Sequence, residues 1–262
     1  MELMTKIDIP VSNWEIDYRD HILLLGSCFA NNMNAKLEEY FFQTKANPTG
    51  TLYNPISIAH HMHDDEVLTA DVIIVTFGTA WVYELNGQVV DNCQKRPASI
   101  FVRRRLTVDD IVSAWRPILE RYREKRFIFT VSPIRHIKDG LHENQISKGI
   151  LLQAVDQIVR GSMIAPAAYF PSYEILMDEL RDYRFYASDM LHPSETAIDY
   201  LWEKFRHTYI YSPRTRESMH ELHQLWLNEQ HRSLHPDSEE DREFRRKVEV
   251  QRTTLKRKYT WL

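Results

Sequence analysis

One stretch near the N-terminus decides the class of fold, and it reads Ile22-Leu23-Leu24-Leu25-Gly26-Ser27-Cys28-Phe29-Ala30. Four consecutive apolar residues that end at a glycine are typical of a buried parallel strand. The glycine lets the backbone turn sharply into a helix. The two polar residues that follow Gly26 are therefore expected at a strand–helix junction.

The same pattern of apolar run and helical stretch recurs down the chain and predicts an open α/β sheet with right-handed crossovers. The further strands are expected at 72–77, 127–131 and 167–170, with a short one at 43–46. The expected helices cover 30–42, 107–123, 143–161 and 193–207. Residues 82–90 alternate around Asn86-Gly87, which predicts an inserted β-hairpin.

Charge divides the chain into two parts. Residues 1–213 carry 22 basic and 28 acidic side chains, whereas residues 214–262 carry 11 and 9. The second part has sparse apolar residues at helical spacing and a break at Pro236-Asp237. We therefore predict a main domain over 1–213 and a charged helical C-terminal extension over 214–262. Two solvated helices packed on the main domain are the simpler interpretation, and a basic surface for a partner or an oligomer contact is the alternative.

Composition excludes several classes of protein. The 262 residues are 43% hydrophobic and 27% charged, an ordinary globular balance, and only two are cysteines, too few for a disulfide framework. No apolar run is long enough to span a membrane, and the first residues do not resemble a signal peptide, so we expect a cytoplasmic protein. The net charge of −4 argues against nucleic acid as a partner. No Cys/His set has zinc spacing and no Gly-rich phosphate loop occurs, so neither metal nor cofactor is expected.

Ligands of open α/β sheets bind beyond the carboxyl ends of the strands, which directs attention to the loops there. The first such loop holds Cys28. A thiol on the first turn of a helix lies beside exposed backbone N–H groups, and the helix dipole lowers its pKa. The N–H groups can also stabilise an oxyanion. A buried structural cysteine and a redox or sensor thiol are the alternatives.

A second candidate lies before the last predicted helix of the main domain, in Ser188-Asp189-Met190-Leu191-His192-Pro193. An aspartate three residues before a histidine can orient the imidazole, which then acts as general base toward a nucleophile from another loop. Asp139 and His142 have the same spacing by chance. Position distinguishes the two pairs, because Asp189 and His192 lie in the loop that faces the strand ends.

Several long strings together resemble one known family. Gly26-Ser27-Cys28-Phe29-Ala30 resembles the motif that names the GSCFA family, and the resemblance extends over about residues 20–205. The supporting strings are 47–55, 76–81, 131–136, 170–174 and 189–193. That family is grouped with the SGNH (GDSL-like) hydrolases. The resemblance implies a three-layer α/β/α sandwich around a five-stranded parallel sheet, and acyl transfer or ester hydrolysis as the chemistry.

The same resemblance implies roles for individual residues. The nucleophile of SGNH enzymes stands two residues after the glycine, which here is Cys28, with Ser27 as the fallback. Asp189 and His192 match the closing Asp-x-x-His.

The oxyanion-binding residues match less well. Gly50 matches the oxyanion-hole glycine of SGNH enzymes. Their oxyanion-hole asparagine is missing, because Gly78 and Thr79 occupy its loop. The Thr79 N–H and the Asn54 side chain are the candidate replacements. His136 is either a substrate-binding residue or a structural imidazole.

The sequence thus predicts an acyl-ester hydrolase or O-acyltransferase with a Cys/Ser-His-Asp site. Its substrate is expected to be an acylated carbohydrate or a similar small ester. The thiol favours transfer to another acceptor, because a thioester intermediate partitions readily. The missing asparagine favours the alternative, which is a catalytically degenerate module that binds carbohydrate or protein.

Overall fold

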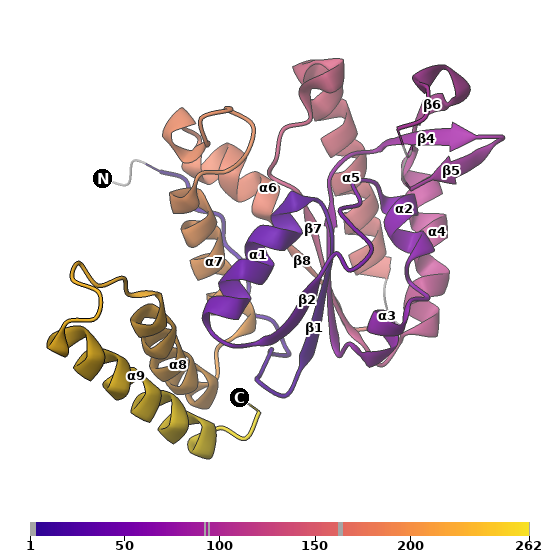
Figure 1. The fold of residues 1–262 in the computed structure, drawn as a ribbon. Helices are drawn as coiled ribbons and strands as arrows, with labels where there is room; N and C mark the ends of the chain where they lie inside the picture. Colours follow the sequence, from indigo (N-terminus) through magenta and orange to yellow (C-terminus); the bar gives the residue numbers. More distant parts are fainter. Residues whose placement is uncertain (1–3, 92, 94, 162–164, 262) are drawn as a thin grey trace.

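A computed structural model describes residues 4–91, 93, 95–161 and 165–261. Its centre is a five-stranded parallel sheet (Figure 1). The strands are β1 (His21–Gly26), β2 (Gln43–Ala46), β3 (Val72–Phe77), β7 (Arg126–Val131) and β8 (Ala167–Phe170). Their order across the sheet is β2-β1-β3-β7-β8. The predicted strands and the predicted sheet are confirmed.

Helices cover both faces of the sheet, because alternate side chains of each buried strand point to opposite faces. Leu24 packs with Phe29 and other residues of α1 (Cys28–Glu39) and α7 (Glu195–Tyr209). Leu23 instead packs with Trp115 and other residues of the opposite face. That face carries α2 (Pro55–His60), α3 (Asp65–Thr69), α4 (Val108–Arg121) and α5 (Leu141–Gly161). Figure 1 shows α1 and α7 on one side and α2, α4 and α5 on the other, which confirms the three-layer sandwich.

The predicted hairpin is present and forms part of a small antiparallel sheet. Strands β4 (Trp81–Leu85) and β5 (Gln88–Val90) are joined by Asn86 and Gly87, both with positive φ, as a tight hairpin turn requires. A third strand, β6 (Val102–Arg105), pairs with the other edge of β4. Three of its four residues are arginines, so it lacks the apolar alternation that would have predicted a strand.

The C-terminal extension is a helical hairpin of α8 (Pro213–Gln230) and α9 (Glu239–Lys258), seen at the lower left of Figure 1. Met219, Leu222 and Leu225 of α8 are buried in the same core cluster as α1 and α7. Helix α9 buries only Asp241 and Leu255. The extension therefore packs on the main domain, mainly through α8. Among the described residues, no helix is both long and apolar enough to cross a membrane.

Some boundaries differ from the predictions for local reasons. Helix α1 begins at Cys28 rather than at residue 30, because Ser27 caps it. It ends at Glu39 rather than at residue 42, because Phe41 has a φ of 60° that no α-helix accommodates. The short helices α2 and α3 were not predicted, since five or six residues give too little periodicity. Beyond β8, α6 (Ser172–Glu174) leads into a π-helical segment over Ile175–Leu180. Short 3-10 turns lie at Ala98–Ile100, Ile137–Asp139 and Tyr183–Phe185.

Candidate active site

Gly26 makes the turn from β1 into α1, and no other residue fits there. Its φ is +127°, and a Cβ at this position would lie 2.1 Å from the Thr76 carbonyl oxygen of the neighbouring strand. That same carbonyl accepts a hydrogen bond from the Ser27 N–H at 3.2 Å. The close approach to β3 therefore requires a glycine and fixes where the next two side chains lie.

Ser27 and Cys28 have different surroundings. Ser27 is completely buried, and its hydroxyl caps α1 by accepting a hydrogen bond from the Phe29 N–H at 3.3 Å. Cys28 is the first residue of α1, is half-buried, and carries a free thiol. In the part of the chain that the structure describes, its backbone N–H has no hydrogen-bond partner. Cys28 is thus the more accessible of the two candidate nucleophiles.

The thiol has one close polar neighbour, the Tyr53 hydroxyl, which the loop after β2 brings to 3.6 Å from Sγ. Burial, and then the hydrogen bond and charge of Cys28, raise the pKa of Tyr53 to about 12. Tyr53 therefore remains a hydroxyl that can donate to the sulfur. Its ring stands edge-on to the imidazole of His136, with 5.7 Å between centroids.

Asp189 and His192 form the predicted couple. Asp189 Oδ2 lies 2.6 Å from Nδ1 of His192, while Oδ1 accepts the backbone N–H groups of Leu191 and His192 at 2.9 and 3.0 Å. Those N–H bonds, with the His192 side chain, lower the pKa of Asp189 to about 2. An ionised carboxylate at Nδ1 favours the tautomer that leaves Nε2 free to accept a proton.

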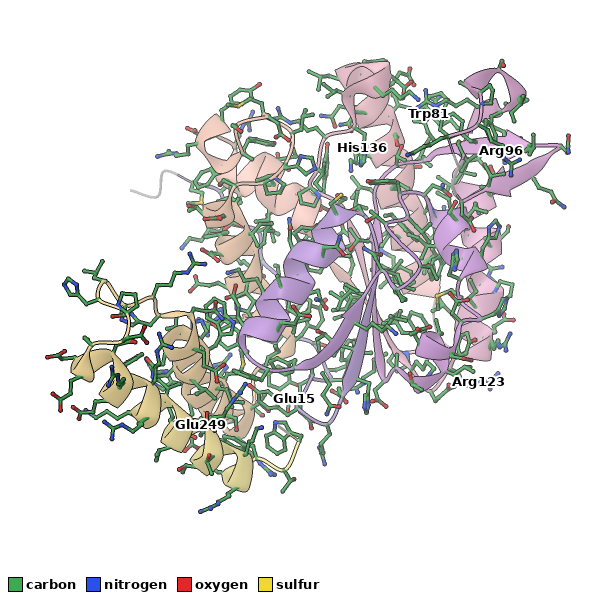
Figure 2. All side chains as sticks on the ribbon, in the orientation of Figure 1. Glu15, Trp81, Arg96, Arg123, His136 and Glu249 are labelled. Atoms are coloured by element: carbon green, nitrogen blue, oxygen red, sulfur yellow. The ribbon has the colours of Figure 1, made fainter. Side chains whose placement is uncertain are left out.

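His136 follows β7, close to this couple. The Arg135 N–H donates to the Leu191 carbonyl at 3.2 Å, and the His136 N–H donates to the Asn144 side chain at 2.9 Å. Burial, followed by the charges of Lys148 and His192, lowers the pKa of His136 to about 3. Figure 2 shows His136 at the end of the sheet where α1 begins, between α1 and Trp81.

The residues expected to bind an oxyanion are mostly engaged elsewhere. The Gly78 and Thr79 N–H groups both donate to the Tyr53 carbonyl, at 2.8 and 2.9 Å. The Gly50 N–H donates to the Asn47 carbonyl at 2.9 Å. The Asn54 side chain caps α2 by accepting the Ser57 N–H at 2.8 Å and donating to its hydroxyl at 2.9 Å. These contacts hold the loops together, and among the described residues they leave Cys28 as the one predicted backbone donor without a partner.

The structure separates the two Asp-x-x-His pairs. Asp139 forms a bidentate ion pair with Arg103, and His142 is exposed on α5. His60 and His61 both contact Asp91. No group of three or more potential metal ligands occurs among the described residues.

Lys148 is a residue that the sequence analysis missed. It lies on α5, is fully buried, and donates to the carbonyls of Gly78 at 2.8 Å and Ser132 at 2.6 Å. Burial lowers its pKa to about 7. A signal was present in the sequence, because Asn144, Ser147 and Lys148 fall on the helical stripe that continues through Leu151. Polar residues on a buried stripe indicate specific buried partners.

The arrangement thus brings Cys28, Tyr53, His136 and the Asp189–His192 couple to one edge of the sheet. The sulfur contacts Tyr53, and no hydrogen bond joins it to the His192 ring among the described residues. An accessible thiol at a helix N-terminus, a carboxylate-oriented imidazole and a free N–H are the parts that acyl transfer requires.

This chain is similar to one sequence family and to several solved structures. The model of the GSCFA family matches residues 21–66 and 61–205. An acetylxylan esterase from Geobacillus stearothermophilus superimposes with a TM-score of 0.49 at 9% identity, over 76% of this chain and 97% of that one. A GDSL-like lipase from Bacteroides thetaiotaomicron gives 0.45 at 10% identity, over 71% and 85%. No curated protein matches the sequence.

Proposed function

The chain belongs to the GSCFA family, and we propose that it hydrolyses or transfers acyl groups, with Cys28 as the nucleophile. The observation that carries this proposal is the 2.6 Å hydrogen bond between Asp189 and His192. Their loop is hydrogen-bonded to the loop that follows β7, at the end of the sheet where α1 begins. The burial of Ser27 and its use as the helix cap support Cys28 over Ser27.

In the proposed reaction His192 Nε2 takes the thiol proton, and the sulfur attacks the acyl carbonyl. The S–C bond forms while the carbonyl electron pair moves to oxygen. The C–O bond to the alcohol then breaks, and His192 returns its proton to that leaving group. Water, or the hydroxyl of an acceptor, then attacks the thioester carbonyl and loses its proton to His192. The S–C bond breaks, and His192 passes this proton to the departing thiolate, which regenerates the Cys28 thiol. Such catalytic contacts are often long before substrate binds and tighten in the complex.

The Cys28 N–H, at the positive end of α1, is the proposed backbone donor to the oxyanion. Asp189 holds His192 and stabilises the imidazolium that forms. Half-exposed Tyr53 lies against the thiol, where its ring can stack on a substrate such as an acylated sugar. The substrate class of the proposal is accordingly an acylated carbohydrate or a similar small ester, and the thiol favours transfer over hydrolysis.

Ester turnover by matched variants tests the proposal. We expect Cys28→Ala and His192→Ala to lose turnover of p-nitrophenyl acetate and acetylated sugars, and Cys28→Ser to keep a reduced rate. The controls are Cys93→Ala, which alters the other free cysteine, and His142→Ala, which alters the exposed histidine of the Asp139–His142 pair. Equal rates for Cys28→Ala and the wild type would refute the proposal. Sugar binding without any turnover would instead support a non-catalytic binding module.

A further inference from the structure

Of the backbone N–H groups expected to bind the oxyanion, that of Cys28 is the one without a partner among the described residues. Three other predicted backbone donors, those of Gly50, Gly78 and Thr79, are bonded to carbonyls within their own loops. One preorganised donor contributes about 3 kcal/mol to acyl transfer, and tetrahedral intermediates are usually held by more than one. An active site of this kind therefore calls for a further donor, which a side chain can supply.

His136 presents the one imidazole nitrogen that is buried and unpaired in the described part of the chain. Its Nε2 has no hydrogen-bond partner and no solvent contact. A buried polar atom without a partner costs about 1–3 kcal/mol, so such atoms are rare unless a ligand or water satisfies them. The unpaired nitrogen therefore offers a hydrogen bond that no described residue uses.

The absence of a side chain at Gly78 lets His136 Nε2 lie close to the turn that carries Ser27 and Cys28. A Cβ on Gly78 would lie 3.2 Å from His136 Nε2, 3.3 Å from Ser27 Cβ and 3.0 Å from the Tyr53 carbonyl oxygen. The missing side chain leaves the imidazole nitrogen beside the turn that carries Cys28. The ring is further located by its edge-on contact with Tyr53, whose hydroxyl touches the thiol.

Lys148 connects the loops that carry Gly78 and His136. Its ammonium group binds the Gly78 and Ser132 carbonyls, which follow β3 and β7, the strands whose loops carry Gly78 and His136. No carboxylate neutralises this buried charge among the described residues. The amine thus fixes the two loops relative to each other and faces His136 with positive charge.

We propose that His136 is a catalytic residue whose Nε2–H donates to the oxyanion of the acyl-transfer reaction, and that Lys148 is its positioning residue. The role rests on the proposed function and adds a second donor beside the Cys28 N–H. Burial keeps the imidazole neutral, and a neutral ring carries one hydrogen, which the proposal places on Nε2. The side chain takes the place of the asparagine that the resemblance to SGNH enzymes led us to expect.

Two reactions of Cys28 separate this role from others. Acetylation by p-nitrophenyl acetate passes through an oxyanion, whereas alkylation by iodoacetamide does not. In His136→Ala we expect acetylation of Cys28 to slow by roughly 100- to 1,000-fold, with alkylation unchanged. His136→Gln, which offers an amide N–H, is expected to recover much of the rate. His142→Ala is the matched control.

Lys148→Met tests the positioning role. We expect slower acetylation through a lower kcat with KM nearly unchanged, unchanged alkylation, and a raised His136 pKa in an NMR titration, because one of the charges facing His136 is gone. The other titratable groups facing that ring, His192 and Tyr53, are unaltered.

The outcomes distinguish the two proposals. If wild-type Cys28 is never acetylated, the proposed function fails. If it is acetylated, and equally fast in His136→Ala, only the oxyanion role fails. If acetylation and alkylation slow together, His136 acts on the thiol rather than on the oxyanion, and the inference is also overturned.

Discussion

The buried amine of Lys148 gives stability a pH dependence that one substitution removes. Its pKa is about 7 in the folded protein, against 10.5 for an ordinary lysine. At about 1.36 kcal/mol per pH unit, burying the charged form costs about 5 kcal/mol below pH 7. Between about pH 7 and 10.5 the unfolded chain binds more protons, so stability rises with pH in this window. The wild type therefore gains about 3 kcal/mol from this group between pH 6 and pH 9.

Lys148→Met lacks this gain. The substitution also leaves the Gly78 and Ser132 carbonyls without their donor, which costs about 1–3 kcal/mol each at any pH. The diagnostic quantity is therefore how the difference in unfolding free energy between wild type and variant changes with pH. Urea denaturation at pH 6 and pH 9 measures it. We expect the wild type to gain about 3 kcal/mol relative to the variant. An equal difference at both pH values would refute a desolvated amine at this position.

Three further perturbations test other parts of the account. Gly26→Ala places a Cβ 2.1 Å from the Thr76 oxygen at a φ of +127°, so we expect no stable fold by circular dichroism. Gly87→Ala, with open space around it, is expected to lose only about 1 kcal/mol and serves as the control, and equal stabilities of the two would contradict this account. Asp189→Asn is expected to lower kcat by up to about 10⁴-fold with KM little changed, and an unaltered kcat would exclude the couple. Leu222→Ala removes a fully buried side chain of α8, so we expect about 2–5 kcal/mol lower stability in a single unfolding transition, whereas a separate transition for the extension would show that it folds independently.

The strands could be predicted because parallel strands buried on both faces are continuous apolar runs, as in β1 and β3. The position of Gly26 could also be predicted, because a glycine is needed where the chain turns sharply out of a strand that lies against its neighbour. Strand β6 could not, because Arg103 and Arg105 are held by tertiary contacts with Asp139 and Glu143 rather than by local pattern. The Asp189–His192 contact was predictable because a spacing of three residues in a loop suffices to bring the two side chains together.

The oxyanion donors could not be identified from the sequence. Whether an N–H is free depends on which carbonyl the fold brings to it, and Tyr53 supplies a carbonyl to both Gly78 and Thr79. The partners of Lys148 could not be predicted either, because only the folded chain brings its amine to the carbonyls that follow two neighbouring strands. Which atom attacks the substrate depends likewise on a three-dimensional property, the burial of Ser27 beside the partly exposed Cys28.

Trapping the acyl-enzyme tests the central claim most directly. The wild type is mixed with p-nitrophenyl acetate, quenched in acid within the first turnovers, digested and analysed by tandem mass spectrometry. We expect an acetyl group as a thioester on Cys28, released by hydroxylamine, with Cys93 unmodified. Ester consumed with the acetyl group on Ser27, or with no label on Cys28 at any quench time, would contradict the account.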